Sequence, residues 1–185
     1  MDSIVEQALN PHRLPLFAVR GISGSGKSTF AEKLKNAIER KSALVSGPYT
    51  NVECFENDEF FIDLETGEYR FDRELCPIAA EWTIGRVAHT LHLKKNTPCI
   101  VANTFTTFNE IRPYMNLAGY FRKWLVVFRM ENAFPNVHNV PADVIDQMKK
   151  RMAGAPFKGE IIVNKDNCDN VINEVAEWVV KHSLK

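Results

Sequence analysis

The chain has no excess of charge of either sign: its 185 residues contain 23 Lys and Arg and 23 Asp and Glu. A balanced chain produces no overall field that would draw it onto nucleic acid or a membrane, so a polyanion would have to be held by a local patch. Long apolar runs are also missing, and no stretch approaches the length of a membrane span. Residues 1–15 include acidic residues and lack the apolar block of a signal peptide. These absences predict a cytoplasmic protein without a membrane segment.

Cysteine is scarce, and the four cysteines are dispersed: Cys54, Cys76, Cys99 and Cys168. They have neither the paired spacing of a zinc site nor the density of a disulfide framework, so we expect reduced thiols. His89 and His92 lie three residues apart on a predicted helix, but no third ligand keeps the spacing of a known metal site. We interpret them as core or surface histidines.

Glycine and serine are concentrated in one segment. Residues 21–29 read GISGSGKST, which is a complete phosphate-binding P-loop pattern. Glycines let the backbone curl so that successive N–H groups point at phosphate oxygens, while Lys27 adds a positive charge and the Ser28 hydroxyl can ligate magnesium. The pattern therefore predicts binding of ATP with Mg²⁺. The predicted nucleotide-binding residues are Gly21, Ser23, Gly24, Ser25, Gly26, Lys27, Ser28 and Thr29.

The flanking segments have the order that a P-loop requires. Residues 16–19 form a short apolar run typical of a buried parallel strand, and apolar side chains recur at helical spacing over 30–41. The helix N-terminus would then direct its dipole and free N–H groups at the phosphates.

The rest of the chain repeats this alternation. Further strands are predicted at 52–55, 98–103, 124–128 and 160–164, and helices from 73 or 74 to about 95 and at 109–119, 142–153 and 169–182, with Pro113 in the first turn of its helix. The alternation predicts an α/β protein with a three-layer P-loop NTPase or kinase fold and a mostly parallel five-stranded sheet. We expect a single P-loop kinase-like domain over residues 1–185, with an N-terminal extension at 1–13 and a lid region at 129–153.

In such a sheet the ligand lies beyond the carboxyl ends of the strands. That rule nominates the P-loop and the segments 57–61, 103–109 and 129–140, all facing one cleft. A carboxylate at a strand end can accept the proton that an acceptor hydroxyl loses during phosphoryl transfer. Strand alternation favours Asp58 over Glu59 for this role, and the competing interpretation is a helix cap or a solvent-exposed acid.

Several segments, taken in order, carry a resemblance to a known family: Arg20 with the P-loop, Asp58 followed by aromatics, 68–72, Trp82, 103–104, 112–114 and 138–141. Over residues 14–153 the chain resembles the polynucleotide-kinase-like branch of P-loop phosphotransferases, which are AAA-type P-loop kinases. The resemblance implies transfer of the ATP γ-phosphate to a hydroxyl, in the best-known members the 5'-OH of DNA or RNA. It implies that Asp58 is the general base and that Lys27 and Ser28 hold the phosphates and metal; Ser28 and Asp58 are the predicted magnesium contacts.

The chain departs from that family at three places. The lid segment 133–136 lacks the arginine that clamps ATP phosphates, Phe61 stands where an arginine would grip an acceptor phosphate, and Ala102 and Asn103 replace an acid after the third strand. Transition-state charge therefore lacks its expected cationic clamp. We nominate Arg129 first, because it directly follows a predicted strand, and then Arg112, Lys149 and Arg151, each of which is otherwise a charge on a solvated helix face.

The acceptor side is less defined by the sequence. Phe60 and Phe61 could form a stacking surface or pack in the core, and 69–73 could line an acceptor pocket or close the domain over the sheet. The basic clusters 122–123 and 149–151 could follow a phosphate backbone or only complement helix ends. We predict an ATP- and Mg²⁺-dependent phosphotransferase acting on a single-stranded DNA or RNA 5' end. The alternatives are a small-molecule or nucleoside kinase with a small hydroxyl acceptor, and a non-catalytic ATP-binding module.

Overall fold

The computed structural model describes residues 3–94, 97–132, 134 and 140–183. Five strands form one sheet in the order β2-β3-β1-β4-β5, and every neighbouring pair is parallel. The strands are β1 (Pro15–Arg20), β2 (Glu53–Phe55), β3 (Cys99–Ala102), β4 (Trp124–Met130) and β5 (Ile161–Val163). The predicted α/β architecture and five-stranded sheet are confirmed.

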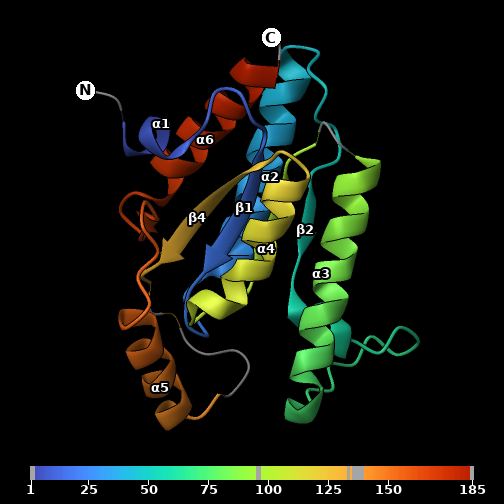
Figure 1. Cartoon of the computed structure of the whole chain (residues 1–185), viewed down its shortest axis with the longest axis vertical. Helices are drawn as coiled ribbons and strands as arrows, with labels where there is room; N and C mark the ends of the chain where they lie inside the picture. The colour runs from blue at the N-terminus through green and yellow to red at the C-terminus, as the bar shows by residue number, and fades with distance from the viewer. Residues whose placement is uncertain (1–2, 95–96, 133, 135–139, 184–185) are drawn as a thin grey trace.

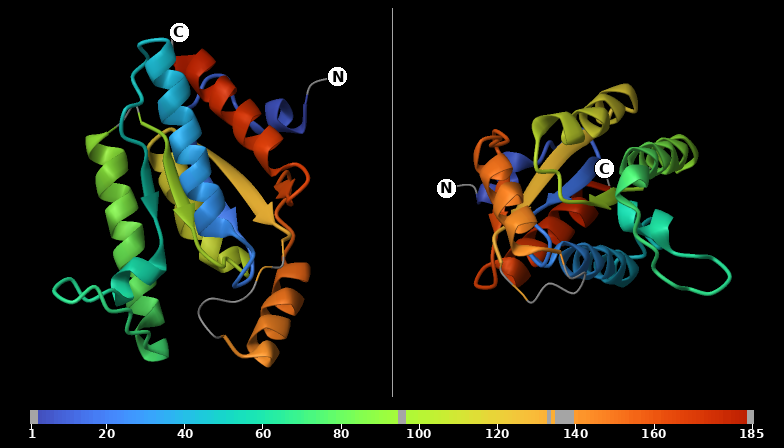
Figure 2. Two further views of the ribbon diagram at one scale, coloured as in Figure 1. Left: turned by 180° about the vertical axis from the view of Figure 1, so that it is seen from behind. Right: turned by 90° about the horizontal axis from the view of Figure 1, so that it is seen from below.

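Helices cover both faces of this sheet (Figure 1 and Figure 2). The long helices are α2 (Lys27–Leu44), α3 (Cys76–Leu93), α4 (Phe108–Tyr120), α5 (Ala142–Ala153) and α6 (Cys168–Ser183). Alternation along β1 separates the two halves of the core: Phe17 and Val19 pack with α2 and α6, whereas Leu16 and Ala18 pack with α3 and α4. Both faces of the central strand are therefore buried, as the apolar run at 16–19 predicted.

The N-terminal extension is part of this core. It contains a short helix that the sequence did not predict, α1 (Ile4–Ala8), in which Ser3 caps the backbone N–H of Glu6. Val5 is buried against the α2 and α6 side of the core, and the Trp124 indole donates a hydrogen bond of 2.8 Å to the Ala8 carbonyl. These contacts hold the extension against β4 and α6.

Helix α4 corrects one sequence prediction. Pro113 lies in the middle of α4 and not in its first turn, because the helix starts earlier, at Phe108. Thr107 and Glu110 form a reciprocal capping box that fixes this earlier start. The helix tolerates the proline at the expense of one backbone hydrogen bond.

The predicted lid region includes parts of two elements. Arg129 belongs to β4, and α5 extends from the carboxyl end of the sheet (Figure 1). Residues 133 and 135–139 lie outside the described residues, and these include two of the four residues of the 138–141 segment. None of the helices within the described ranges combines the length and apolar character needed to cross a bilayer.

Candidate active site

The P-loop connects β1 to α2 at the carboxyl edge of the sheet. Gly26 is the N-cap of α2 with a φ of 85°, a left-handed conformation that favours glycine, and no side chain caps the helix there. Gly21 is required for a different reason: a Cβ at this position would lie 2.2 Å from the Ser25 hydroxyl oxygen. The free N–H groups of the first turn of α2 are thus directed at the loop, as anion binding at a helix N-terminus requires.

The Lys27 ammonium lies across this loop and donates a hydrogen bond of 2.9 Å to the Ile22 carbonyl. Burial lowers the pKa of Lys27, and the negative charges of Glu56 and Asp58 act in the opposite direction. The Ser25 hydroxyl is fully buried without a hydrogen-bond partner among the described residues. A half-buried cation, an unpartnered hydroxyl and an uncapped helix N-terminus together fit a bound phosphate chain.

Glu56 is the residue that sequence analysis missed. The Ser28 hydroxyl, predicted to ligate magnesium, donates a hydrogen bond of 2.9 Å to the Glu56 carboxylate and not to Asp58. Burial raises the pKa of Glu56, and its hydrogen bond to Ser28 partly offsets that effect. The available signal was its position directly after β2, at the carboxyl edge of the sheet.

Asp58 lies in the 3₁₀ helix η1 (Asn57–Phe61), which a capping box between Glu56 and Glu59 starts. Glu59 is further held in an ion pair of 2.5 Å with Arg86 of α3, so its carboxylate has a structural role. Asn103, after β3, fixes the same loop, because its side chain exchanges hydrogen bonds of 2.8 and 3.1 Å with Asn57. Asp58 is therefore the carboxylate of η1 that these contacts leave available.

Asp58 faces both the P-loop and the segment that follows η1. Its charge acts on Lys27 on one side, and on the other side it forms a hydrogen bond with Tyr69. Burial, together with the charge and the hydrogen bond of Asp58, raises the pKa of Tyr69 to about 12. The same carboxylate also contributes, after burial, to the raised pKa of Cys76 at the start of α3.

The first two arginines nominated as phosphate clamps differ in the ion pairs that they form. Arg129 forms ion pairs with Glu160, at 2.8 Å, and with Glu131, so its guanidinium is committed to carboxylates. Glu160 also pairs at 3.1 Å with the fully buried Arg20, which precedes the P-loop. Arg112 is exposed on α4 and forms no hydrogen bond or ion pair within the described part of the chain. The geometry does not favour the clamp role for Arg129 and leaves Arg112 available for it.

Other nominated residues are placed as follows. His89 and His92 are both exposed on α3, and no group of three or more His, Cys, Asp or Glu side chains suited to a metal ion occurs within the described ranges. Lys123 is buried, with 4% of its surface exposed, so the 122–123 pair is not a surface cluster. All four cysteines are free thiols, as predicted.

A cavity of about 330 Å³ adjoins the P-loop on the side of the α6 N-terminus. Its lining includes Gly26, Thr29, Met130, Asn132 and Phe134. The Phe134 backbone N–H donates a hydrogen bond of 2.9 Å to the Gly24 carbonyl, which attaches the segment after β4 to the P-loop. The cavity thus continues from the phosphate loop and can receive the rest of a nucleotide.

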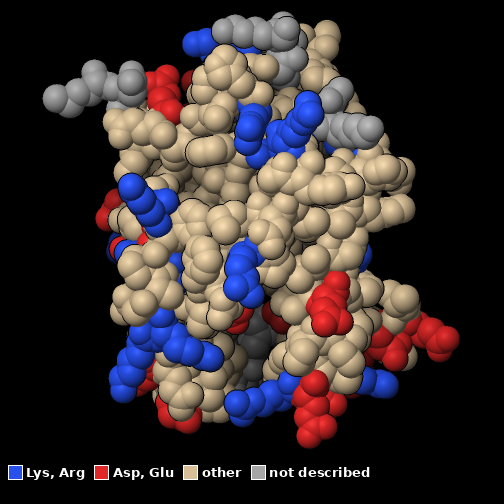
Figure 3. All heavy atoms as spheres, viewed as in Figure 1, with Lys and Arg blue, Asp and Glu red and all other residues tan. Residues whose placement is uncertain are grey.

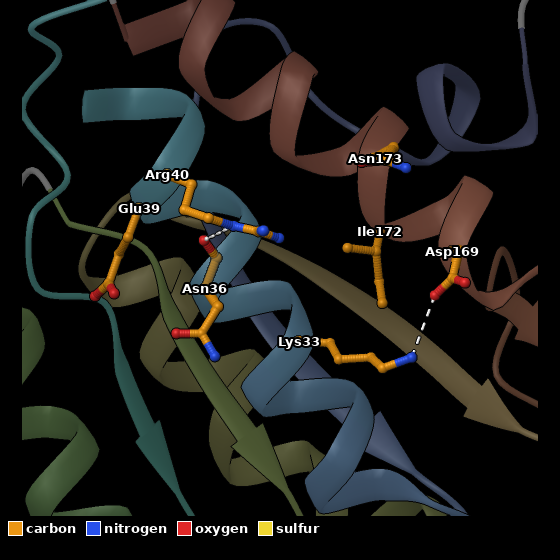
Figure 4. Close-up of a pocket in the computed structure, with 7 residues that line it drawn as sticks. All are labelled: Lys33, Asn36, Glu39, Arg40, Asp169, Ile172 and Asn173. Carbon is orange, nitrogen blue, oxygen red and sulfur yellow. Dashed lines mark hydrogen bonds and ion pairs between the residues drawn. The ribbon is translucent and has the colours of Figure 1, made fainter. Parts of the chain in front are cut away.

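A larger hollow of about 620 Å³ lies between α2 and α6 (Figure 4). Its basic side chains are already engaged: Lys33 pairs with Asp169 at 3.3 Å, and Arg40 donates to the Asn36 carbonyl at 3.2 Å. It is a groove between two helices on the flank of the sheet and contains none of the predicted site residues.

A curated relative shares this sequence over most of its length. The uncharacterized protein PM0531 of Pasteurella multocida (strain Pm70) is 33% identical over 153 residues, which cover 80% of this chain and 82% of PM0531. This chain belongs to the PM0531 family. No protein-family model matches the sequence.

Several solved structures share the fold of this chain. Kti12 of Chaetomium thermophilum, solved with ADP-AlF3, is similar with a TM-score of 0.62 and 11% identity, over 91% of this chain and 99% of that one. The tunicamycin resistance protein of Deinococcus radiodurans gives a TM-score of 0.54 with 15% identity, over 90% and 96%. The APS kinase CysC of Mycobacterium tuberculosis, solved with AMPPNP and APS, gives a TM-score of 0.51 with 15% identity, over 94% and 99%. Identities this low show a shared fold, the three-layer α/β P-loop fold.

Proposed function

We propose that this chain is a phosphotransferase that moves the γ-phosphate of ATP to the hydroxyl of an acceptor. The observation that carries the proposal is the position of Lys27 between the P-loop backbone and two carboxylates, Glu56 and Asp58. Binding of a magnesium-nucleotide complex alone would need the lysine and one carboxylate near the metal, so the second carboxylate, Asp58, is the one that points to transfer. A carboxylate beside the outer phosphate is the group that an acceptor hydroxyl needs. The APS kinase among the structural neighbours supports this class of reaction.

The residues present also fit magnesium. Mg²⁺ is usually held by one or two protein oxygens and the substrate phosphates, so it needs no dedicated cage. The Ser28 hydroxyl and the Glu56 carboxylate, 2.9 Å apart, are hard oxygen donors next to the P-loop and would hold it there, with Asp58 as the predicted further contact. When bound, the ion neutralises charge on the β- and γ-phosphates.

In the proposed step the acceptor oxygen forms a bond to the γ-phosphorus, the bond from that phosphorus to the leaving oxygen breaks, and ADP leaves. Asp58 takes the proton that the acceptor hydroxyl loses. Lys27 and the N–H groups at the start of α2 stabilise the charge on the phosphates. Arg112 is the unpaired cation that we assign to the transferring phosphoryl group.

The decisive experiment follows γ-labelled ATP with magnesium and a panel of hydroxyl acceptors that includes a single strand with a free 5'-OH. Asp58→Asn should abolish transfer and preserve ATP binding, because asparagine keeps the shape of the side chain but cannot take the proton. Glu59→Gln is the matched control, since Glu59 is held by Arg86, and it should retain transfer. Full activity in Asp58→Asn would remove this residue from the mechanism.

A non-catalytic ATP-binding module is the second candidate. Arg129, one of the nominated phosphate clamps, is paired with Glu160 and Glu131. This pairing favours the non-catalytic alternative, because that cation is then not free to contact a transferring phosphoryl group. Tight Mg-ATP binding without transfer to any acceptor would identify this alternative.

A further inference from the structure

The cleft wall beyond Asp58 is acidic. Residues 56–86 contain nine Asp and Glu against three Arg and no Lys, a formal charge of −6 in a chain whose total charge is zero. Two of the three arginines are already paired, Arg70 with Glu68 at 2.8 Å and Arg86 with Glu59 at 2.5 Å. Figure 3 shows acidic side chains gathered over the lower end of α3 and the adjoining hairpin, beside a hollow in the surface. An acceptor that approaches Asp58 from this side meets a negative field.

The same wall is lined with aromatic rings. Phe61 is buried, with 6% of its surface exposed, and its ring lies 5.4 Å from that of Phe60, 6.2 Å from Tyr69 and 5.1 Å from Phe71. Trp82 of α3 extends the group, with its ring 5.7 Å from Phe60. Phe61 is therefore the packed centre of the cluster and not an open stacking surface.

The rings around Phe60 and Phe61 remain partly accessible, although the Arg86 guanidinium lies over the Trp82 ring, 4.3 Å from its centroid. Phe71 is 57% exposed, Tyr69 39% and Trp82 38%, and we call these three residues the aromatic wall. Soluble proteins seldom expose several large rings side by side without a binding role. The hairpin that carries Tyr69 is closed by backbone hydrogen bonds, including Arg70 N–H to the Phe61 carbonyl at 2.8 Å. The hairpin backbone thus holds Tyr69 in place, and helix α3 holds Trp82.

The aromatic wall begins at the proposed base. The Tyr69 hydroxyl is hydrogen-bonded to Asp58, so a ring resting on the wall brings its substituents next to that carboxylate. Tyr69 of the aromatic wall is therefore adjacent to Asp58, and Asp58 in turn lies near Lys27.

We propose that the acceptor is an alcohol without negative charge, bound through a flat or apolar group on the aromatic wall. This inference rests on the proposed phosphotransfer and names its substrate class. A polynucleotide would bring its phosphates against the acidic residues of 56–86, where like charges repel. The residue that would grip such a phosphate is Phe61, which is buried among rings. The structure thus favours the small-molecule or nucleoside acceptor over the polynucleotide 5' end that the resemblance implied.

Four probes each carry thymine and a single 5'-hydroxyl and differ in charge: 3'-amino-3'-deoxythymidine, thymidine, thymidine 3'-monophosphate and a 5'-hydroxyl pentathymidylate. Each is titrated calorimetrically into the protein saturated with magnesium and a non-hydrolysable ATP analogue. We expect affinity to fall in the order given, by about tenfold or more between thymidine and the pentathymidylate. Equal or tighter binding of the pentathymidylate, or no binding of any probe, would overturn the inference.

Two sets of variants test the surface itself. Trp82→Ala should weaken thymidine binding about tenfold, the loss expected for one stacked ring, whereas Tyr120→Ala should not, because that exposed ring lies at the end of α4. Glu65→Lys combined with Glu74→Lys should strengthen binding of the pentathymidylate, and Glu174→Lys on α6 is the matched control. An unchanged thymidine affinity in Trp82→Ala would contradict the aromatic wall. Mg-ATP affinity is measured for every variant, so a failed acceptor assignment is distinguished from a failed P-loop assignment.

Discussion

The Ser28 hydroxyl donates a hydrogen bond of 2.9 Å to the Glu56 carboxylate, joining the first turn of α2 to the residue that follows β2. Both groups are hard oxygen donors beside the phosphate loop. Asp58, two residues further on, faces the acceptor side. In the proposed reaction the two acids would therefore have separate roles, Glu56 as a magnesium contact and Asp58 as the base that faces the acceptor.

Glu56→Gln should weaken nucleotide binding about tenfold in the presence of magnesium and leave it unchanged with EDTA, because only the metal-dependent contact is removed. Glu53→Gln is the control, at the opposite end of β2 and paired with Lys94. The raised pKa of Glu56 adds a pH dependence: protonation should reduce Mg-ATP affinity at a higher pH than an ordinary glutamate would, and this step should disappear in Glu56→Gln. Equal magnesium dependence in mutant and parent would exclude Glu56 from the site.

Lys27→Met should abolish tight Mg-ATP binding and make the protein more stable at neutral pH. The pKa of Lys27 is lowered by burial from 10.5, so the folded protein releases this proton more readily than the unfolded chain does. The charged lysine therefore costs stability below its folded pKa, and the cost disappears as the pH rises toward 10.5. We expect a Tm increase of about 2–4 °C at pH 7, the equivalent of about 1 kcal/mol in a chain of this size.

The melting temperatures of Lys27→Met and its parent should converge as the pH approaches 10.5, and Lys150→Met, on an exposed turn of α5, serves as the control. A destabilised Lys27→Met protein, or one that binds Mg-ATP normally, would contradict the assignment.

Arg129→Ala and Arg112→Ala should affect different properties. Arg129→Ala removes one partner of the nearly buried Glu160 and should cost about 1–3 kcal/mol of unfolding free energy with turnover largely retained. Arg112→Ala, on an exposed helix face, should leave stability unchanged and reduce kcat about a hundredfold with a smaller effect on nucleotide affinity. Thermal unfolding and steady-state kinetics of both variants separate the roles. Full turnover in Arg112→Ala would leave the transferring phosphoryl group without its assigned cation.

Cys76 offers a test of Asp58 that does not depend on activity. Burial raises the pKa of the Cys76 thiol, and the Asp58 charge is the next contribution. Asp58→Asn should therefore increase the thiolate fraction and speed alkylation at pH 8, by about twofold or more. The rate is measured with N-ethylmaleimide and peptide mapping; Cys99, whose pKa burial raises to about 12, is the internal unreactive thiol. An unchanged Cys76 rate would mean that Asp58 does not face the start of α3.

The local patterns of the sequence determined the fold and the phosphate end of the site. A P-loop is continuous in the chain, and its glycines, lysine and serine act at fixed offsets, so residues 21–29 could be recognised without knowledge of the rest. The strands were predicted because apolar runs buried on both sides of a parallel sheet have few alternatives. The helix at 4–8 was missed because five residues are too short for a periodic pattern.

Tertiary structure alone decided which charges are available. The sequence favoured Arg129 over Arg112 as the phosphate clamp, but Glu160, thirty-one residues after Arg129, pairs with Arg129 and, within the described residues, leaves Arg112 free. Glu56 is nominated as a metal contact only because the Ser28 hydroxyl, twenty-eight residues away in sequence, donates a hydrogen bond to it. Phe61 packs against Phe71 and therefore offers no open stacking surface. Side-chain pairing depends on distances that only the folded sheet sets, because parallel strands bring their carboxyl ends together from separate parts of the chain. The sequence by itself thus determined which loop is the candidate phosphate site, and the packing of η1, the hairpin and α3 decided which side chains surround it.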